Sequence, residues 1–185
     1  MTYTRWGRTS CPNNTEAQLV YSGRAGGTNY QSRGGSAEKL CLPDDPDYNF
    51  PGSVDLSSSS VKSVVQGAEY EADNSISGNP IKHLDDHNVP CAVCDVPIRS
   101  RVIMIPAKTT CPLSWMREYY GYLTTERDTY YRSSYSCMDI DPEVIPGTAS
   151  NTDPSLFYPT VTDCNGLSCP PYVNNHVLSC VVCTK

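Results

Sequence analysis

Ten cysteines carry the clearest chemical signal in the sequence. They are Cys11, Cys41, Cys91, Cys94, Cys111, Cys137, Cys164, Cys169, Cys180 and Cys183. Paired C-x-x-C segments can bind zinc as thiolates, whereas oxidised thiols form disulfides. Both C-x-x-C pairs, starting at Cys91 and Cys180, enclose only Ala and Val, which are typical of a buried strand rather than a zinc knuckle. No βαβ pattern of a thioredoxin-type redox site surrounds them. We therefore predict disulfides, no structural zinc, and an oxidising, extracellular compartment.

The segment His83-Leu84-Asp85-Asp86-His87 places two imidazoles and two carboxylates within five residues. On a helix the two histidines would face the same way, as zinc ligands of the H-x-x-x-H type do. The segment lacks the glutamate of H-E-x-x-H, and Pro90 follows closely, so a stable helix is not expected. We expect a polar turn before the strand that enters Cys91, with Asp86 and His87 hydrogen-bonded to loop backbone. Metal binding is the alternative, with calcium held by the aspartates or zinc held by the histidines.

Acidic side chains recur in two places, each shortly after a cysteine. The two segments are Asp44-Asp45-Pro46-Asp47 and Asp139-Ile140-Asp141-Pro142-Glu143. Two carboxylates can act as acid and base in glycoside hydrolysis, but their repetition favours a structural role as solvated Asp-Pro turns. The chain has no G-x-S-x-G, and its three histidines have no identifiable Ser or Cys partner. We therefore expect a protein that is not an enzyme.

Tyrosine is the main sequence signal for binding, with 13 Tyr against 2 Phe. Six tyrosines lie between Trp115 and Tyr135, close to charged side chains that include Arg127 and Asp128. A tyrosine ring offers an apolar face for stacking on a sugar, and polar groups nearby fix the hydroxyls of a glycan. In a small domain such rings also form the core, which is the alternative. The candidate ligand residues are Arg117, Tyr119, Tyr120, Tyr122, Tyr130, Tyr131 and Arg132, together with Asp86 and His87.

The elements that must position these residues are predicted to be mostly β, because short runs of Val, Ile, Tyr and Thr alternate with Gly, Pro, Asn and Asp. The expected strands are residues 19–22, 63–70, 92–96, 101–105, 119–124, 155–158, 172–173 and 176–183. Residues 115–120 and 36–40 could form helical turns instead, although neither is long enough to be stable alone. The polar tract at residues 55–60 predicts a surface loop.

Four landmarks recur in one order and indicate an internal duplication. Residues 7–12, 19–23, 40–46 and 89–94 resemble residues 107–112, 119–123, 136–142 and 178–183. We expect two tandem halves, residues 1–100 and 101–185, that form one compact, disulfide-stapled unit. The first two cysteines of each half should bridge to its C-x-x-C pair, because a bridge between cysteines three apart on a strand would be strained. Which joins which stays open, and Cys164 should bridge locally to Cys169.

Composition excludes several classes of partner. The 185 residues carry 14 basic and 20 acidic side chains, a formal net charge of −6, without a Lys/Arg-rich run, so nucleic acid is not an expected partner. The longest apolar stretch, residues 102–105, is far shorter than the roughly 20 residues of a membrane span, so no membrane insertion is expected. The sequon Asn13-Asn14-Thr15 predicts a glycan on Asn13 of a secreted protein.

Several longer segments resemble a known family. They are residues 3–12, 67–70, 86–94, 169–173 and 180–183. They are similar to the C-terminal non-collagenous domain of short-chain, spongin-type collagens and related secreted invertebrate proteins. A looser likeness is to the non-collagenous domain of type IV collagen and to sponge-type lectins. The resemblance implies a β-rich homo-oligomer and, for the lectin-like products, glycans or matrix glycoproteins as partners. The alternative that it implies is a self-associating, trimerising head, although no Gly-X-Y tract lies in this chain.

Overall fold

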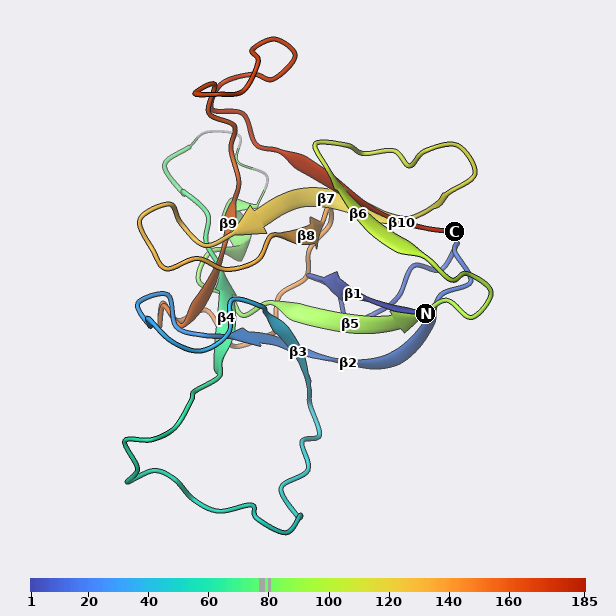
Figure 1. Ribbon diagram of the computed structural model, residues 1–185. Helices are drawn as coiled ribbons and strands as arrows, with labels where there is room; N and C mark the ends of the chain where they lie inside the picture. Colours follow the sequence, from blue (N-terminus) through green and yellow to red (C-terminus); the bar gives the residue numbers. More distant parts are fainter. Residues whose placement is uncertain (77–78, 80) are drawn as a thin grey trace.

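The computed structural model describes residues 1–76, 79 and 81–185, and β-strands make up almost all of its regular structure (Figure 1). The strands are β1 (Thr2–Trp6), β2 (Gln18–Gly27), β3 (Leu40–Pro43), β4 (Gln66–Tyr70), β5 (Pro90–Asp95), β6 (Val102–Pro106), β7 (Met116–Thr125), β8 (Ser136–Asp139), β9 (Ser155–Pro159) and β10 (Ser179–Thr184). A short 3-10 helix, η1, spans Lys82–Leu84. The prediction of a mostly β protein is confirmed. In the described part of the chain, no helix has the length and apolar character that crossing a bilayer requires.

β7 illustrates why the apolar segments become strands. It pairs antiparallel with β10 along one edge and with β8 along the other, so its backbone groups find partners on both sides. Its side chains alternate between two faces, and Tyr119 and Leu123 point into the same core cluster. A helical turn at residues 115–120 is therefore wrong, because β7 begins at Met116.

Some elements differ from the sequence patterns. The patterns do not predict β1, β3 or β8, each of which has only four or five residues. The strand expected at residues 172–173 does not form, and Tyr172 is a bend; residues 36–40 form no helical turn. The polar tract at residues 55–60 is confirmed as surface. It belongs to a long exposed loop, residues 44–65, that leads from β3 to β4 and projects from the body in Figure 1.

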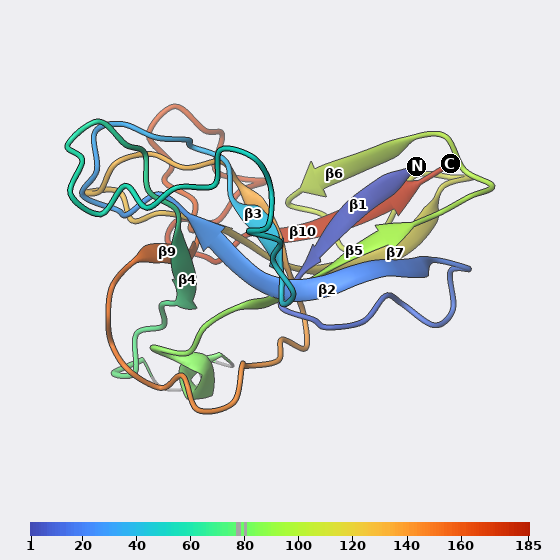
Figure 2. The ribbon, with the colours of Figure 1, turned by 90° about the horizontal axis from the view of Figure 1, so that it is seen from below.

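The strands form one sheet in the order β6-β10-β7-β8-β1-β5-β2-β4-β9, with β3 paired to β2. Strands β1 to β5 belong to residues 1–100 and strands β6 to β10 to residues 101–185. The two halves meet where β8 runs parallel to β1, with Trp6 opposite Met138, and where β9 runs parallel to β4. The loops after β2 and after β7 consequently gather at one end of the molecule (Figure 2).

Five disulfides staple the fold and resolve the pairing that the sequence leaves open. In residues 1–100 the bridges are Cys11–Cys94 and Cys41–Cys91. In residues 101–185 they are Cys111–Cys183 and Cys137–Cys180. Both halves thus join their first cysteine to the last one of the C-x-x-C pair. The predicted local bridge Cys164–Cys169 is also confirmed. The disulfides indicate an oxidising environment, while the internal duplication itself stays a prediction.

The core consists of two clusters, and each contains side chains from both halves. The first surrounds the central disulfides and includes Tyr3 and Tyr119, whose rings stack with centroids 6.1 Å apart. The second includes Tyr70, Met138 and Phe157 and lies nearer to η1. Both halves therefore depend on each other for burial of their apolar side chains.

Candidate functional site

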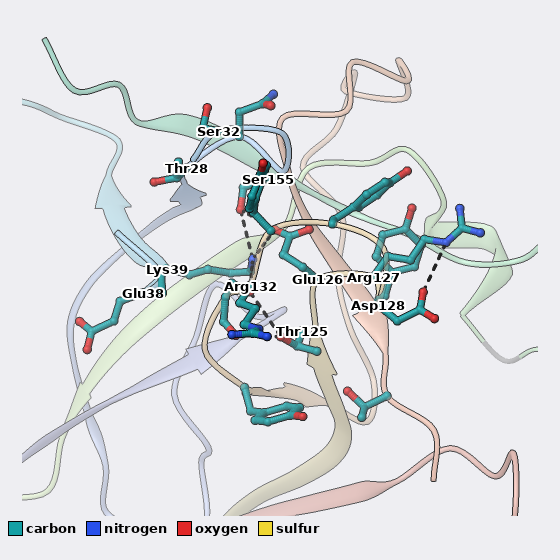
Figure 3. A pocket seen from close by; sticks show the side chains of 18 of the residues that line it. Thr28, Ser32, Glu38, Lys39, Thr125, Glu126, Arg127, Asp128, Arg132 and Ser155 are labelled. Atoms are coloured by element: carbon teal, nitrogen blue, oxygen red, sulfur yellow. Dashed lines mark hydrogen bonds and ion pairs between the residues drawn. The ribbon is translucent and has the colours of Figure 1, made fainter. Parts of the chain in front are cut away.

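The described surface contains an open cleft of about 1250 Å³ (Figure 3). Its walls are residues 28–39, which connect β2 to β3, residues 125–135, which connect β7 to β8, and residues 158–163, which follow β9. Backbone hydrogen bonds hold the first two walls together, because Tyr131 N–H donates to Tyr30 O and Ser134 N–H donates to Ala37 O. The cleft is thus built from both halves of the chain.

A buried ion pair forms the innermost part of the cleft. Lys39 Nζ lies 3.1 Å from Glu126 Oε1 and also donates to the hydroxyls of Ser155 and Ser133 (Figure 3). The same Glu126 oxygen accepts the N–H of Leu156 at 2.9 Å. Desolvation lowers the pKa of Lys39, and the charge of Glu126 opposes this effect. Glu126 Oε2 is buried without a hydrogen-bond partner among the described residues. The ion pair therefore joins the end of residues 28–39 to the start of residues 125–135 at the base of both walls.

Tyrosines line the mouth of the cleft. Tyr130 packs between Tyr30 and Tyr158, with ring centroids 4.2 Å and 6.1 Å apart. These three rings support one another and are only partly exposed. Tyr131 and Tyr135 are more open, with 46% and 60% of their surface accessible. They are the rings of the cleft with the most free surface for an apolar contact.

Charged and hydroxyl groups border these rings. Arg33 Nε donates to the hydroxyl of Tyr131 at 2.9 Å, which orients that ring. Arg127 lies 4.0 Å from Asp128, and both are exposed (Figure 3). Arg132 is exposed and forms no ion pair within the described residues. The cleft therefore offers both hydrogen-bond donors and acceptors, with no strong excess of one charge.

The structure brings three of the predicted ligand residues together at this cleft, namely Tyr130, Tyr131 and Arg132. Tyr119 is a correction: its ring lies in the core, and its hydroxyl lies 3.0 Å from the carbonyls of Thr4 and Cys137. Burial is the main reason that its pKa is raised. Side chains alternate between the inward and outward faces of β7, and the sequence alone does not show on which face Tyr119 lies. Tyr119 is not available to a ligand.

The other predicted residues lie elsewhere. Arg117 stacks over Tyr120 at 4.8 Å, and both border a second hollow of about 270 Å³. Asn13 is exposed at the edge of that hollow, whereas Thr15 of the same sequon is buried. Tyr122 is partly buried against the second core cluster. The predicted ligand residues therefore do not form one surface but lie at separate places on the molecule.

Asp86 and His87 belong to an acidic cluster near η1, apart from the cleft. Glu71 lies within 4.8 Å of Asp85 and Asp86 on one side and of Glu69 and Asp153 on the other, as measured between carboxylate oxygens. His87 Nδ1 lies 2.9 Å from the carbonyl of Asp85, in the loop contact that the sequence predicts. Burial raises the pKa of Asp86, and the charge of Asp85 adds to it. Carboxylate oxygens are ligands that calcium takes, and calcium here stays a prediction.

Burial also governs the proton affinity of Glu71 at the centre of that cluster. It raises the pKa of Glu71 to about 7, and the charges of Asp85, Asp153 and Asp86 contribute. Its Oε1 atom is buried without a hydrogen-bond partner in the described residues. Burial and Glu71 together raise the pKa of Tyr158, which also contacts Tyr130 in the cleft. Tyr158 thus lies between the acidic cluster and the cleft.

Sequence reasoning missed the opposite wall of the cleft. Lys39 and Ser155 line the cleft but lie far from residues 125–135 in the chain. The Gly- and Ser-rich composition of residues 32–36 indicates only a loop. A charged residue beside a strand, such as Lys39, carries no sign that it will be buried.

The cleft offers ring faces and hydrogen-bonding groups to a ligand. All ten cysteines are in disulfides, so no thiol is available as a nucleophile. The Lys39 and Glu126 side chains are paired with each other and almost fully buried. No protein-family model matches the chain, and a search of curated proteins finds no relative.

Proposed function

We propose that this protein is a secreted, non-enzymatic recognition module that binds glycans in the cleft between residues 28–39 and 125–135. The observation that carries the proposal is the cleft itself: an open hollow of about 1250 Å³ that is lined by both polar and apolar groups, with exposed tyrosines at its mouth. Five disulfides support secretion. An extracellular or matrix setting is also what the sequence resemblance to spongin-type secreted proteins implies.

The composition of the cleft suits a sugar better than an apolar ligand. A glycan presents apolar C–H faces for ring stacking and many hydroxyls for hydrogen bonding. Tyr131 and Tyr135 supply the exposed rings, and Arg132, Asp128 and Thr28 supply polar groups within the same hollow. Two walls that hydrogen-bond to each other limit the loss of loop freedom on binding.

The test is binding of the oxidised protein to a broad glycan array, with soluble sugar as competitor. We expect a sugar-competed signal that Tyr131→Ala and Arg132→Ala each weaken about tenfold, corresponding to about 1.4 kcal/mol. Tyr48→Ala is the matched control, because Tyr48 is an exposed tyrosine on the loop of residues 44–65, outside the cleft. Absence of binding by folded protein, or equal loss in all three variants, would refute the proposal.

A second candidate function is self-association as a structural head domain. The loop of residues 44–65 favours it, because it projects from the body and exposes large apolar side chains to solvent. They are Tyr48, Phe50, Val54, Leu56, Val61, Val64 and Val65. An assembly domain forms a defined oligomer and ignores sugars, so molar mass in solution and the glycan array separate the two candidates.

A further inference from the structure

The loop of residues 44–65 is held to the rest of the molecule at its ends only. All of its residues are exposed except Ser59, which is half-buried, and the loop projects from the body (Figure 1). At its start, Asp44 pairs with Arg24. From residue 45 to residue 64, the hydrogen bonds found in the described part of the chain join loop residues only to one another. The loop backbone can therefore change conformation without breaking hydrogen bonds to the sheet.

This loop contains one basic side chain, Lys62, which is also the only one between Lys39 and Lys82. The Nζ atom of Lys62 donates to the carbonyls of Leu56 and Ser57 at 3.1 Å and 3.0 Å. Both hydrogen bonds are exposed, so water or another acceptor can replace them. The side chain of Lys62 is therefore available to a partner that binds a cation.

The residues around Lys62 suit binding in an extended conformation. Residues 56–65 contain no proline and no acidic side chain. A peptide substrate binds to a protease along its backbone as an added strand, and a protease of the trypsin type holds a lysine or arginine side chain in an acidic S1 pocket. Exposed loops of small and polar residues without backbone contacts to the fold are the usual places at which proteases cut. The segment around Lys62 meets each of these requirements.

The aromatic residues of the same loop are less suitable for cleavage. Phe50 is followed by Pro51, which has no N–H group and a fixed φ angle. Tyr48 directly follows Asp47 in an acidic stretch. The sequence of the loop therefore favours a protease that selects lysine over one that selects an aromatic side chain.

Other exposed basic residues lie where the backbone is held. Arg33, Arg127 and Arg132 belong to the two walls of the cleft, whose backbones hydrogen-bond to each other. Lys108 directly follows a residue whose N–H donates to β10 at 2.7 Å. Lys82 lies in the helix η1. A protease can cut at these places only after hydrogen-bonded backbone opens, so cleavage there should be slower than after Lys62.

A cut after Lys62 leaves the connections between the two pieces intact. The pieces are residues 1–62 and residues 63–185. Both disulfides of residues 1–100 join one piece to the other. The sheet also continues across the cut, because β5 of the second piece pairs with β1 and β2 of the first. The two walls of the cleft come from different pieces, and both stay in place.

We propose that the peptide bond between Lys62 and Ser63 is a processing site for an extracellular serine protease specific for lysine or arginine, and that the cut protein stays folded as two disulfide-linked chains. The protease serine attacks the carbonyl carbon of Lys62, and the bond to the nitrogen of Ser63 breaks, which releases a free amine. Water then releases Lys62 as a carboxylate, so the net reaction is hydrolysis and needs no other reactant. This inference goes beyond glycan binding and does not depend on it.

The experiment is limited digestion of the oxidised protein with trypsin, followed on denaturing gels with and without reductant and by intact mass. We expect one early cut, after Lys62, that gives a single band without reductant and two bands with it. The mass of the unreduced product should exceed that of the uncut chain by one water molecule. The melting temperature of this product should be close to that of the uncut protein until reductant is added.

Three variants test the assignment to Lys62. Lys62→Gln should slow the loss of intact chain at least about tenfold, because the remaining sites require hydrogen-bonded backbone to open. Lys62→Arg should keep the early cut, since the S1 pocket accepts both side chains. Lys108→Gln removes an exposed lysine outside the loop and should leave the rate unchanged.

The contrary outcomes are equally specific. A first cut at any other residue, such as one in a cleft wall, refutes the site. An oxidised chain that stays intact under conditions in which trypsin digests the reduced chain also refutes it. Pieces that separate without reductant, or a cut protein that melts far below the uncut one before reduction, refute the proposal that the two-chain product stays folded.

Discussion

Lys39 and Glu126 form an ion pair that joins the two halves of the chain at the innermost part of the cleft. Nζ lies 3.1 Å from Oε1, and only 1% and 3% of the two side chains is exposed. The pair connects the end of one cleft wall to the start of the other, so its geometry sets the spacing between the two walls.

We predict that removing one partner of this pair destabilises the protein strongly. Lys39→Met leaves the carboxylate of Glu126 buried without its cation, which typically costs about 3–5 kcal/mol. Replacing both residues, as Lys39→Met with Glu126→Leu, should cost less than the sum of the single changes. Equilibrium urea unfolding measures both effects. Removal of the exposed pair Arg24–Asp44 is the control and should cost no more than about 1 kcal/mol. Equal losses at the two pairs would contradict this account.

Disulfides should contribute to stability according to the length of chain that they close. Cys41–Cys91 closes a separation of 50 residues, whereas Cys164–Cys169 closes only five. Replacing both cysteines of the first bridge by Ser should cost about 2–5 kcal/mol, and the same change at the local bridge should cost clearly less. Calorimetry of the two double variants checks the order.

Reductant should likewise lower the melting temperature steeply, whereas EDTA should leave it nearly unchanged. The reason is that sulfur bridges, not metal, hold the C-x-x-C segments. A large fall of the melting temperature in EDTA would contradict this prediction and would direct attention to the carboxylates around Glu71.

Most of the strands could be predicted, because they depend on local patterns, and so could the bridging of the first two cysteines of each half to its C-x-x-C pair. Apolar β-branched runs such as residues 92–96 indicate a buried strand by composition alone. β1 and β8 have no such pattern, because Arg5 and Asp139 are charged. Each charge is neutralised by the other across 134 positions of sequence, which a single-sequence pattern does not reveal.

The cleft shows the same division between local and distant information. The cluster of tyrosines and arginines at residues 127–135 marks one wall, since several ring-bearing and charged residues lie together in the sequence. The opposite wall, residues 28–39, depends on backbone pairing with that cluster, as between Tyr30 and Tyr131. Tyr119 fails as a ligand residue because strand alternation alone does not say which face is inward.

Stability should depend on pH through Glu71. Burial, with the nearby charges of Asp85, Asp153 and Asp86, raises the pKa of Glu71 to about 7, whereas an unfolded glutamate has a pKa of about 4.3. Between these values the folded protein holds a proton that the unfolded chain has lost. The contribution of Glu71 to the free energy of unfolding therefore falls as pH rises from about 4.3 to about 7, and it is constant above that.

The measurement is the free energy of unfolding across this pH range for the wild type and for Glu71→Gln. The variant should be more stable than the wild type at pH 8 and should lose this part of the pH dependence. Asp47→Asn, an exposed acid outside the cluster, is the control. A wild type and a Glu71→Gln variant with parallel pH profiles would contradict the assignment.

A further prediction concerns Gly23 and Gly121, which lie where β2 pairs with β3 and where β7 pairs with β8. A Cβ atom on Gly23 would lie 1.8 Å from the carbonyl oxygen of Leu42, and one on Gly121 would lie 1.9 Å from that of Met138. Both obstacles are backbone atoms of a paired strand, so neither can move aside without breaking the β2–β3 or β7–β8 ladder.

Gly23→Ala and Gly121→Ala should therefore each lower the free energy of unfolding, measured in urea, by about 1–3 kcal/mol or more. Gly34→Ala, where no atom lies within 4 Å of the added Cβ, should change stability by less than about 0.5 kcal/mol. Because the added Cβ atom meets a backbone oxygen at nearly the same distance in both places, Gly23→Ala and Gly121→Ala should lower the free energy of unfolding by similar amounts. A large loss at one glycine and none at the other would contradict this prediction.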